Sequence, residues 1–238
     1  MGSEICTKDW EYFDQIYCIS LDQREDRRAD ARIQFEKVGV LDRVEFVIVR
    51  KHLHSFEQGI FESHMRCIRK GIEANARNIV IFEDDVQFER FSHANLRRCI
   101  EFLSGNPNWN AFFFGCLVGA SEKTENRSVI KVQYRCLAHA YVLNRGFAEV
   151  LVNKPWQEIA YDNMLSSFNE AFYAVYPSFA FQSNSPTDNR SLRLDRLRRL
   201  CGGLRRIQKC NEAYYRHRRV FIGLHIMVVL LIVIWALR

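Results

Sequence analysis

The chain has 238 residues, of which 48% are hydrophobic and 13% aromatic, a composition that excludes an intrinsically disordered protein. Its formal net charge of +6 is unevenly spread, because residues 193–219 hold ten Arg or Lys against two acids. The rest of the chain is mildly acidic, so the body is not a basic protein, and we expect one domain of about 200 residues plus a basic appendage.

Apolar runs and helical stripes alternate along the first half of the chain. The predicted elements are a strand at 15–20, a helix from the charged run 22–32 to Gly39, a strand at 44–50, a helix at about 60–76, a strand at 78–82 and a helix capped by Ser92. Strands alternating with helices in this way are typical of an α/β domain.

The second half of the body is richer in strands. Strands are predicted at 111–115, 129–135, 139–143 and 172–176, with a helix capped by Asn144 and another beginning near Asp162. Late, hairpin-like strands added to an alternating first half indicate a three-layer α/β domain with a mixed sheet over residues 1–192.

The basic segment, residues 193–219, is itself patterned. Leu194, Leu197, Leu204 and Ile207 recur at helical spacing among arginines, and Gly202–Gly203 interrupts the helix. A basic amphipathic helix of this kind is typical of an anionic membrane surface, and nucleic-acid binding is the alternative.

An apolar run without formal charge follows at residues 220–237. Its length predicts a single transmembrane tail anchor, and the arginines before it place the preceding domain on the cytoplasmic side. The alternative is a buried C-terminal core helix. Eight scattered cysteines without a C-x-x-C pair indicate buried free thiols in a reducing compartment, and no zinc site is expected.

Charged clusters follow two of the predicted strands. Glu83, Asp84 and Asp85 end the strand at 78–82, and the run from Asp22 to Arg28 follows the first strand. Ligands of open α/β sheets bind beyond the carboxyl ends of strands. Mg²⁺ and Mn²⁺ prefer carboxylate oxygens and bridge them to phosphates, so an acidic set beside a basic set suits a nucleotide sugar. The alternative for the acidic triplet is a solvated loop.

Several sequence blocks point to one family. They are ISLDQREDRR (19–28), GIFESH (59–64), IVIFEDDVQF (79–88), HAYVLNRGFAEVL (139–151), and YDNML (161–165) with YPSFAFQSNSPTD (176–188). In this order they resemble glycosyltransferase family 25, which includes lipooligosaccharide galactosyltransferases and collagen β-galactosyltransferases. Ser20, Ile60 and Leu137–Ala138 stand where the family usually has Asn, Cys and Gly-Thr.

The resemblance implies a GT-A fold and an inverting transfer that depends on Mn²⁺ or Mg²⁺. The donor would be a nucleotide sugar, of which a UDP-sugar is expected, and the sugar moved would be galactose-like. A membrane anchor favours a lipid-linked saccharide acceptor of the lipopolysaccharide or lipooligosaccharide type over a protein acceptor.

The resemblance also suggests roles for individual residues. Asp85, with Glu83, would bind the metal in the manner of a DxD motif, and Asp162 would be the general base. The predicted donor-binding residues are Asp22, Arg24, Arg28, His64, Glu83, Asp84, His139 and Asp188.

Structural alternatives accompany several of these roles. Arg27 and Arg32 are expected on a solvated helix face, and Asp162 could be an N-cap. His64 and His139 could simply pack in the core. At the level of function, the alternatives are a catalytically inactive, membrane-bound binding module and a nucleic-acid-binding protein.

Overall fold

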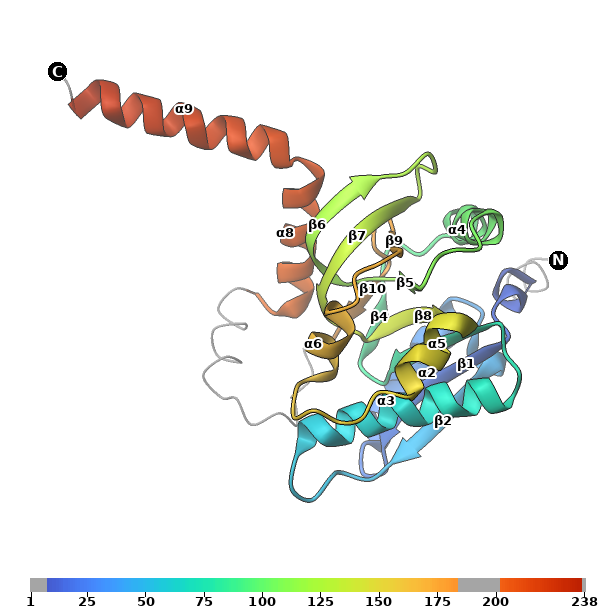
Figure 1. Ribbon diagram of the computed structural model, residues 1–238. Helices are drawn as coiled ribbons and strands as arrows, with labels where there is room; N and C mark the ends of the chain where they lie inside the picture. Colours follow the sequence, from blue (N-terminus) through green and yellow to red (C-terminus); the bar gives the residue numbers. More distant parts are fainter. Residues whose placement is uncertain (1–7, 184–201, 237–238) are drawn as a thin grey trace.

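A mixed sheet organises the computed structural model, which describes residues 8–183 and 202–236 (Figure 1). Within these residues it has eight strands in the order β2-β1-β3-β8-β5-β9-β7-β6, and a two-stranded sheet joins β10 to β4. The strands are β1 Gln15–Leu21, β2 Val44–Val49, β3 Asn78–Glu83, β4 Val86–Phe88, β5 Ala111–Phe113, β6 Leu117–Lys123, β7 Val129–Cys136, β8 Ala140–Asn144, β9 Phe172–Val175 and β10 Ala180–Gln182. The α-helices are α2 Glu25–Lys37, α3 Phe56–Glu73, α4 His93–Gly105, α5 Arg145–Val152, α6 Tyr161–Ser166, α8 Leu204–Arg216 and α9 Arg218–Ala236.

Strand direction brings three chain segments to one edge of the large sheet. β1 pairs in parallel with β2 and β3, with Ile19 opposite Glu83. β8 runs antiparallel to β3, with Ala140 opposite Phe82. The carboxyl ends of β1 and β3 therefore meet the beginning of β8, which is where an α/β sheet places its ligand.

Helices cover both faces of the sheet. Alternate strand residues point to opposite faces, so Ile16 and Cys18 pack in one apolar cluster, whereas Tyr17 packs in the other. The first cluster includes residues of α2 and α4, and the second includes residues of α3 and α5. The three-layer α/β arrangement predicted from the sequence is confirmed, and the cysteines in the described residues (Cys18, Cys67, Cys99, Cys116, Cys136 and Cys210) are free thiols.

Local capping explains where two helices begin. The Ser55 hydroxyl accepts a hydrogen bond from the Gln58 amide, so α3 begins four residues before the predicted start at about 60. Asn144 caps α5 as predicted, because its side chain accepts from the Phe147 amide at 2.7 Å. The strands β4, β6 and β10 were not predicted, and the first and last of these pair with each other.

Helix α8 lies against the domain although its sequence is strongly basic. The Asn211 side chain bonds both the amide and the carbonyl of Val118 in β6, each at 3.0 Å. Gln208 donates to the Ala180 carbonyl in β10, and Arg205 and Lys209 pair with Glu89. In the described part of the predicted basic segment, 193–219, Arg205 and Lys209 therefore hold α8 against Glu89 of the domain.

The last helix, α9, runs away from the sheet (Figure 1). Its apolar side chains are exposed, including Val220 at 59% and Ile226 at 56%. Among the described residues no helix combines the length and the apolarity that a bilayer span requires, so the transmembrane helix predicted at 220–237 is not supported.

Close packing of α3 on β3 can be tested at Gly71. A Cβ there would lie 2.4 Å from Ile79 Cδ1 and 2.5 Å from its Cγ1. We expect Gly71→Ala to lower the free energy of unfolding by about 1–3 kcal/mol, measured in urea, because the tight core must be overpacked. Gly105→Ala is the matched control, since a Cβ there meets nothing within 4 Å. Equal stability of the two variants would contradict this packing.

Candidate active site

The acidic triplet lies at the edge where β1, β3 and β8 meet. The Glu83 amide donates to the His139 carbonyl at 2.9 Å, and the Asp84 amide donates to the Ile19 carbonyl at 3.1 Å. The chain then enters β4 after Asp85, whose carbonyl accepts from the Ser183 amide at 2.8 Å. Backbone pairing to several segments therefore fixes all three acids, and the solvated-loop alternative is wrong, because Asp84 and Asp85 are only 7% and 8% exposed.

A cavity of about 440 Å³ opens over these acids. Its walls come from the ends of β1, β2 and β3, the start of α3, the turn before β8, the start of α6, the end of β10 and the start of α8. The polar residues that line it include Arg27, His64, Glu83, Asp84, Asp85, His139, Tyr161, Asp162 and Gln182. Segments far apart in sequence thus build one pocket over the acidic triplet.

Burial raises the pKa of all three acids of the triplet. It raises the pKa of Glu83 to about 8, with further increases from the charges of Asp162 and Asp84. The pKa of Asp85 rises to about 7, first through burial and then through the charge of Glu83. Burial also raises the pKa of Asp84, although Ser20 and Arg27 oppose this. The site therefore favours a cation that would relieve the repulsion.

Arg27 supplies a positive charge in this site, so the prediction that it lies on a solvated helix face is wrong. Its Nη1 lies 3.4 Å from Asp84 Oδ1 and 3.7 Å from Asp85 Oδ2. The Arg27 side chain is 14% exposed and those of both acids are 8% exposed. Arg27 thus belongs to the site, as one of the three arginines, with Arg24 and Arg28, that the sequence offers for phosphate.

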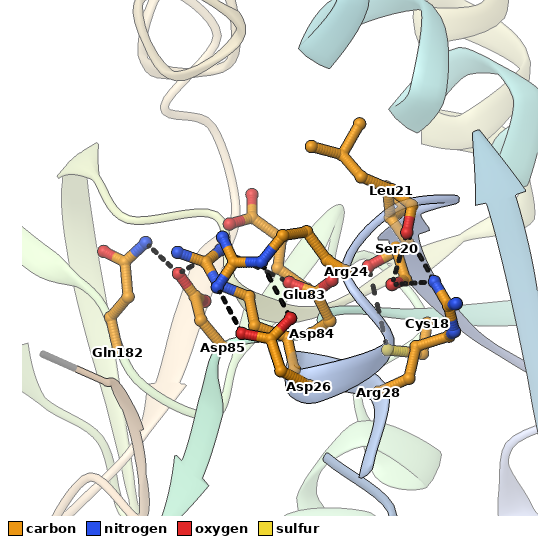
Figure 2. A network of polar contacts seen from close by, with 12 residues as sticks. Cys18, Ser20, Leu21, Arg24, Asp26, Arg28, Glu83, Asp84, Asp85 and Gln182 are labelled. Atoms are coloured by element: carbon orange, nitrogen blue, oxygen red, sulfur yellow. Dashed lines mark hydrogen bonds and ion pairs between the residues drawn. The ribbon is translucent and has the colours of Figure 1, made fainter. Parts of the chain in front are cut away.

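Asp85 has one satisfied and one unsatisfied oxygen. Gln182 donates to Oδ2 at 2.8 Å, as Figure 2 shows, whereas the buried Oδ1 has no hydrogen-bond partner among the described residues. No three His, Cys, Asp or Glu side chains in the described part of the chain converge on a metal position. Mg²⁺ commonly uses one or two protein carboxylates and completes its shell with phosphate oxygens and water, so Asp85 and Glu83 fit such an ion.

His64 joins the triplet to a buried pair of tyrosines. Its Nε2 lies 3.3 Å from Glu83 Oε1, and its Nδ1 lies 2.9 Å from Tyr141 Oη, which in turn is 2.7 Å from Tyr161 Oη. The imidazole stacks on the Tyr161 ring with centroids 4.1 Å apart. Burial lowers the pKa of His64 to about 4, so the ring is neutral at pH 7. His64 is therefore both packed in the core and placed at the cavity.

His139 is the second buried histidine at the cavity. It is 1% exposed, and neither ring nitrogen has a hydrogen-bond partner of good geometry among the described residues. Burial lowers its pKa to about 4, although the nearby backbone of Ala180 and Leu137 opposes this. His139 therefore lies in the cavity wall as a buried imidazole beside the backbone of Leu137 and Ala180.

Asp162 lines the cavity with a carboxylate that several donors hold in place. Oδ1 accepts from the Tyr134 hydroxyl and, at 3.2 Å, from the Ala138 amide, and Oδ2 accepts from the Leu137 amide at 3.0 Å. Leu137 has a φ of +76°, and Asp162 fixes this turn. The N-cap of α6 is Ala160, so the N-cap alternative for Asp162 is wrong.

The predicted residues on the nucleotide side are not part of the cavity lining, although the charge of Arg24 favours the ionised form of Asp84. Arg28 bonds the carbonyls of Leu21 and Asp22 and so fixes the turn after β1, and Arg24 pairs with Asp26 at 2.8 Å (Figure 2). Asp22, Arg24 and Arg28 do not line the cavity in the described part of the chain. Asp188 lies outside the described residues.

The comparisons with known proteins agree with the motif blocks. The chain is 24% identical to "Glycosyltransferase 25 family member" of Drosophila pseudoobscura pseudoobscura over 176 residues, which confirms the resemblance to glycosyltransferase family 25. The match covers 61% of this chain, and the chain spans about 28% of the length of that relative. No protein-family model matches the chain.

Similar solved structures have low sequence identity to the chain. A197 from STIV is 13% identical with a TM-score of 0.48, covering 71% of this chain and 84% of that one. A glycosyltransferase involved in the glycosylation of the major capsid of PBCV-1 is 11% identical with a TM-score of 0.40, covering 64% and 74%.

The raised pKa of Glu83 predicts that the stability of the protein depends on pH. The folded-state pKa of Glu83, about 8, exceeds its ordinary value of 4.5, so the folded protein holds a proton that the unfolded chain releases. The contribution to stability is therefore present at low pH and is lost as the pH rises from about 4.5 to about 8. We expect Glu83→Gln to raise Tm more at pH 8.5 than at pH 5.5, measured by differential scanning fluorimetry.

The matched control for this pH effect is Glu122→Gln, at an exposed position in β6. We expect it to leave Tm unchanged at both pH values. A Glu83→Gln effect independent of pH would contradict the raised pKa.

Proposed function

We propose that the protein is a glycosyltransferase that moves a galactose-like sugar from a nucleotide-sugar donor to a saccharide acceptor with inversion, in a GT-A-like domain. The observation that carries this proposal is the acidic triplet, with Asp84 and Asp85 buried, under a cavity of about 440 Å³, and with Asp85 Oδ1 unpartnered among the described residues. The sequence similarity to a glycosyltransferase family 25 member supports the same reaction class. A catalytically inactive binding module is the alternative.

Asp85 and Glu83 would hold Mn²⁺ or Mg²⁺ with the donor diphosphate. When bound, such an ion neutralises the charge that develops on the departing nucleotide diphosphate. Gln182 fixes the Asp85 carboxylate from one side, and His64 fixes Glu83. His139, buried in the cavity wall, would contact the donor.

Donor binding is tested by thermal shift with a set of nucleotide sugars, with and without Mn²⁺. We expect one UDP-sugar with Mn²⁺ to raise Tm, because ligand bound to the native state stabilises it. Asp85→Asn should abolish the Mn²⁺-dependent part of the shift, whereas Asp26→Asn, at an exposed position, should retain it. A shift without measurable sugar transfer would favour the binding module, and no shift with any donor would contradict the proposal.

We further propose that Asp162 takes the proton from the acceptor hydroxyl. The support is its place in the cavity wall and the three donors that keep its oxygens fixed. We expect Asp162→Asn to lower the transfer rate about 10²–10⁴-fold, the usual range for general-base catalysis, with the donor thermal shift retained.

The structural role of Asp162 has its own readout. An asparagine side chain at this position cannot accept from all three donors, so we expect the Tm of Asp162→Asn to fall as well. Tyr134→Phe is the matched control, since it removes one donor and leaves the carboxylate in place. Transfer retained in Asp162→Asn would contradict the assignment of the base.

We also propose that α9 attaches the protein to an anionic lipid surface, and that the acceptor saccharide is lipid-linked. The exposed apolar side chains of α9 and the arginines Arg218 and Arg219 at its start support this. In flotation with phosphatidylserine-containing vesicles, we expect the wild type to float and the variant Ile226→Asp/Val229→Asp to remain in the bottom fraction. Glu122→Gln should float like the wild type, and equal flotation of the double variant would contradict the proposal.

A further inference from the structure

Arg27 lies between two neighbouring cavities and lines both. It lines the cavity of about 440 Å³ and a second one of about 160 Å³, and Asp84 and Asp85 line both as well. Arg27 is the third residue of α2, and α2 packs on β1 and β4, which flank the triplet. The packing of α2 on β1 and β4 therefore places the Arg27 guanidinium beside the acids.

The ion pairs of Arg27 with Asp84 and Asp85 are longer than strong charge-assisted hydrogen bonds. Nitrogen–oxygen separations of 3.4 and 3.7 Å exceed the distance of about 2.7–2.9 Å that is typical of a strong charge-assisted hydrogen bond. Asp85 Oδ1 keeps no hydrogen-bond partner beside them in the described part of the chain. Arg27 therefore offsets the negative charge while one oxygen of Asp85 stays available for another cation.

The positive charge of Arg27 acts on the whole triplet. Its electrostatic effect favours the ionised forms of Glu83, Asp84 and Asp85. The charge of Arg24 also favours the ionised form of Asp84, but Arg27 is the arginine that lines the cavity. Because Asp85 Oδ1 has no hydrogen-bond partner among the described residues, the pocket keeps room for a divalent cation, which Arg27 repels while the acids attract it. When a diphosphate enters with the ion, the same guanidinium has an anionic partner that matches its donor geometry.

We propose that Arg27 is a resident counter-ion of the triplet: it competes with a divalent cation that arrives alone, and it supports one that arrives with a nucleoside diphosphate. This inference rests on the proposed function for the identity of the ligands. It assigns to Arg27 a coupling role, which makes occupation of the metal site depend on the presence of the donor.

The test compares two binding measurements on the full chain with Arg27→Gln. Binding of Mn²⁺ alone is followed by electron paramagnetic resonance, and binding of uridine diphosphate at saturating Mn²⁺ by isothermal titration calorimetry. We expect Arg27→Gln to bind Mn²⁺ alone about tenfold more tightly, because a nearby positive charge is gone, and to bind uridine diphosphate about tenfold more weakly. Arg27→Lys should restore both values in part, and Arg32→Gln, on the exposed face of α2, should change neither.

The opposite signs of the two changes distinguish the inference from simpler roles. If Arg27→Gln weakens both bindings, Arg27 only maintains the shape of the pocket, and the inference is overturned. If it changes neither, Arg27 is not coupled to the metal, which also overturns it. If the wild type itself binds neither Mn²⁺ nor uridine diphosphate, the proposed function fails, and that result is separate from any effect of the substitution.

Discussion

The packing of three adjacent carboxylates, two of them buried, against Arg27 is the constraint on which the rest of this site depends. Glu83 and Asp84 are fixed by backbone hydrogen bonds to His139 and Ile19, so the acids cannot separate to relieve their repulsion. Arg27 offsets part of the charge from the side of α2. The remaining negative charge makes the pocket attract cations. Holding the carboxylates together lowers the stability of the fold.

The sheet order explains how this pocket is assembled. β3 ends between a parallel strand and an antiparallel one, so the turn after β1 and the residues before β8 reach the same edge as the triplet. The small sheet of β4 and β10 then returns the chain, and Gln182 meets Asp85 across 97 residues of sequence. Helix α8 contacts β10 as well, so a segment late in the chain braces the wall of the cavity.

The sequence predicted the elements whose patterns are local. The apolar runs of β1, β2 and β3 and the Asn144 cap are such signals, and the position of Glu83 to Asp85 after a buried strand was enough to place the triplet at the sheet edge. The pairing of β4 with β10 could not be predicted, because three-residue strands separated by about 90 residues leave no periodic signal.

The directions of the side chains on α2 and α3 could not be predicted from the sequence either. Helix α2 is polar on nearly all of its surface, so its sequence does not show whether Arg24, Arg27 or Arg28 points inward. Arg28 instead fixes the turn after β1, and Arg27 meets the acids. The stacking of His64 on Tyr161 likewise depends on α3 and α6 meeting in space.

The most direct measurement is an anomalous difference map from a crystal grown with Mn²⁺ and uridine diphosphate. We expect a manganese peak within about 2–2.5 Å of an Asp85 oxygen, with the diphosphate in the same coordination shell. A map with bound nucleotide but no manganese at the triplet would contradict it.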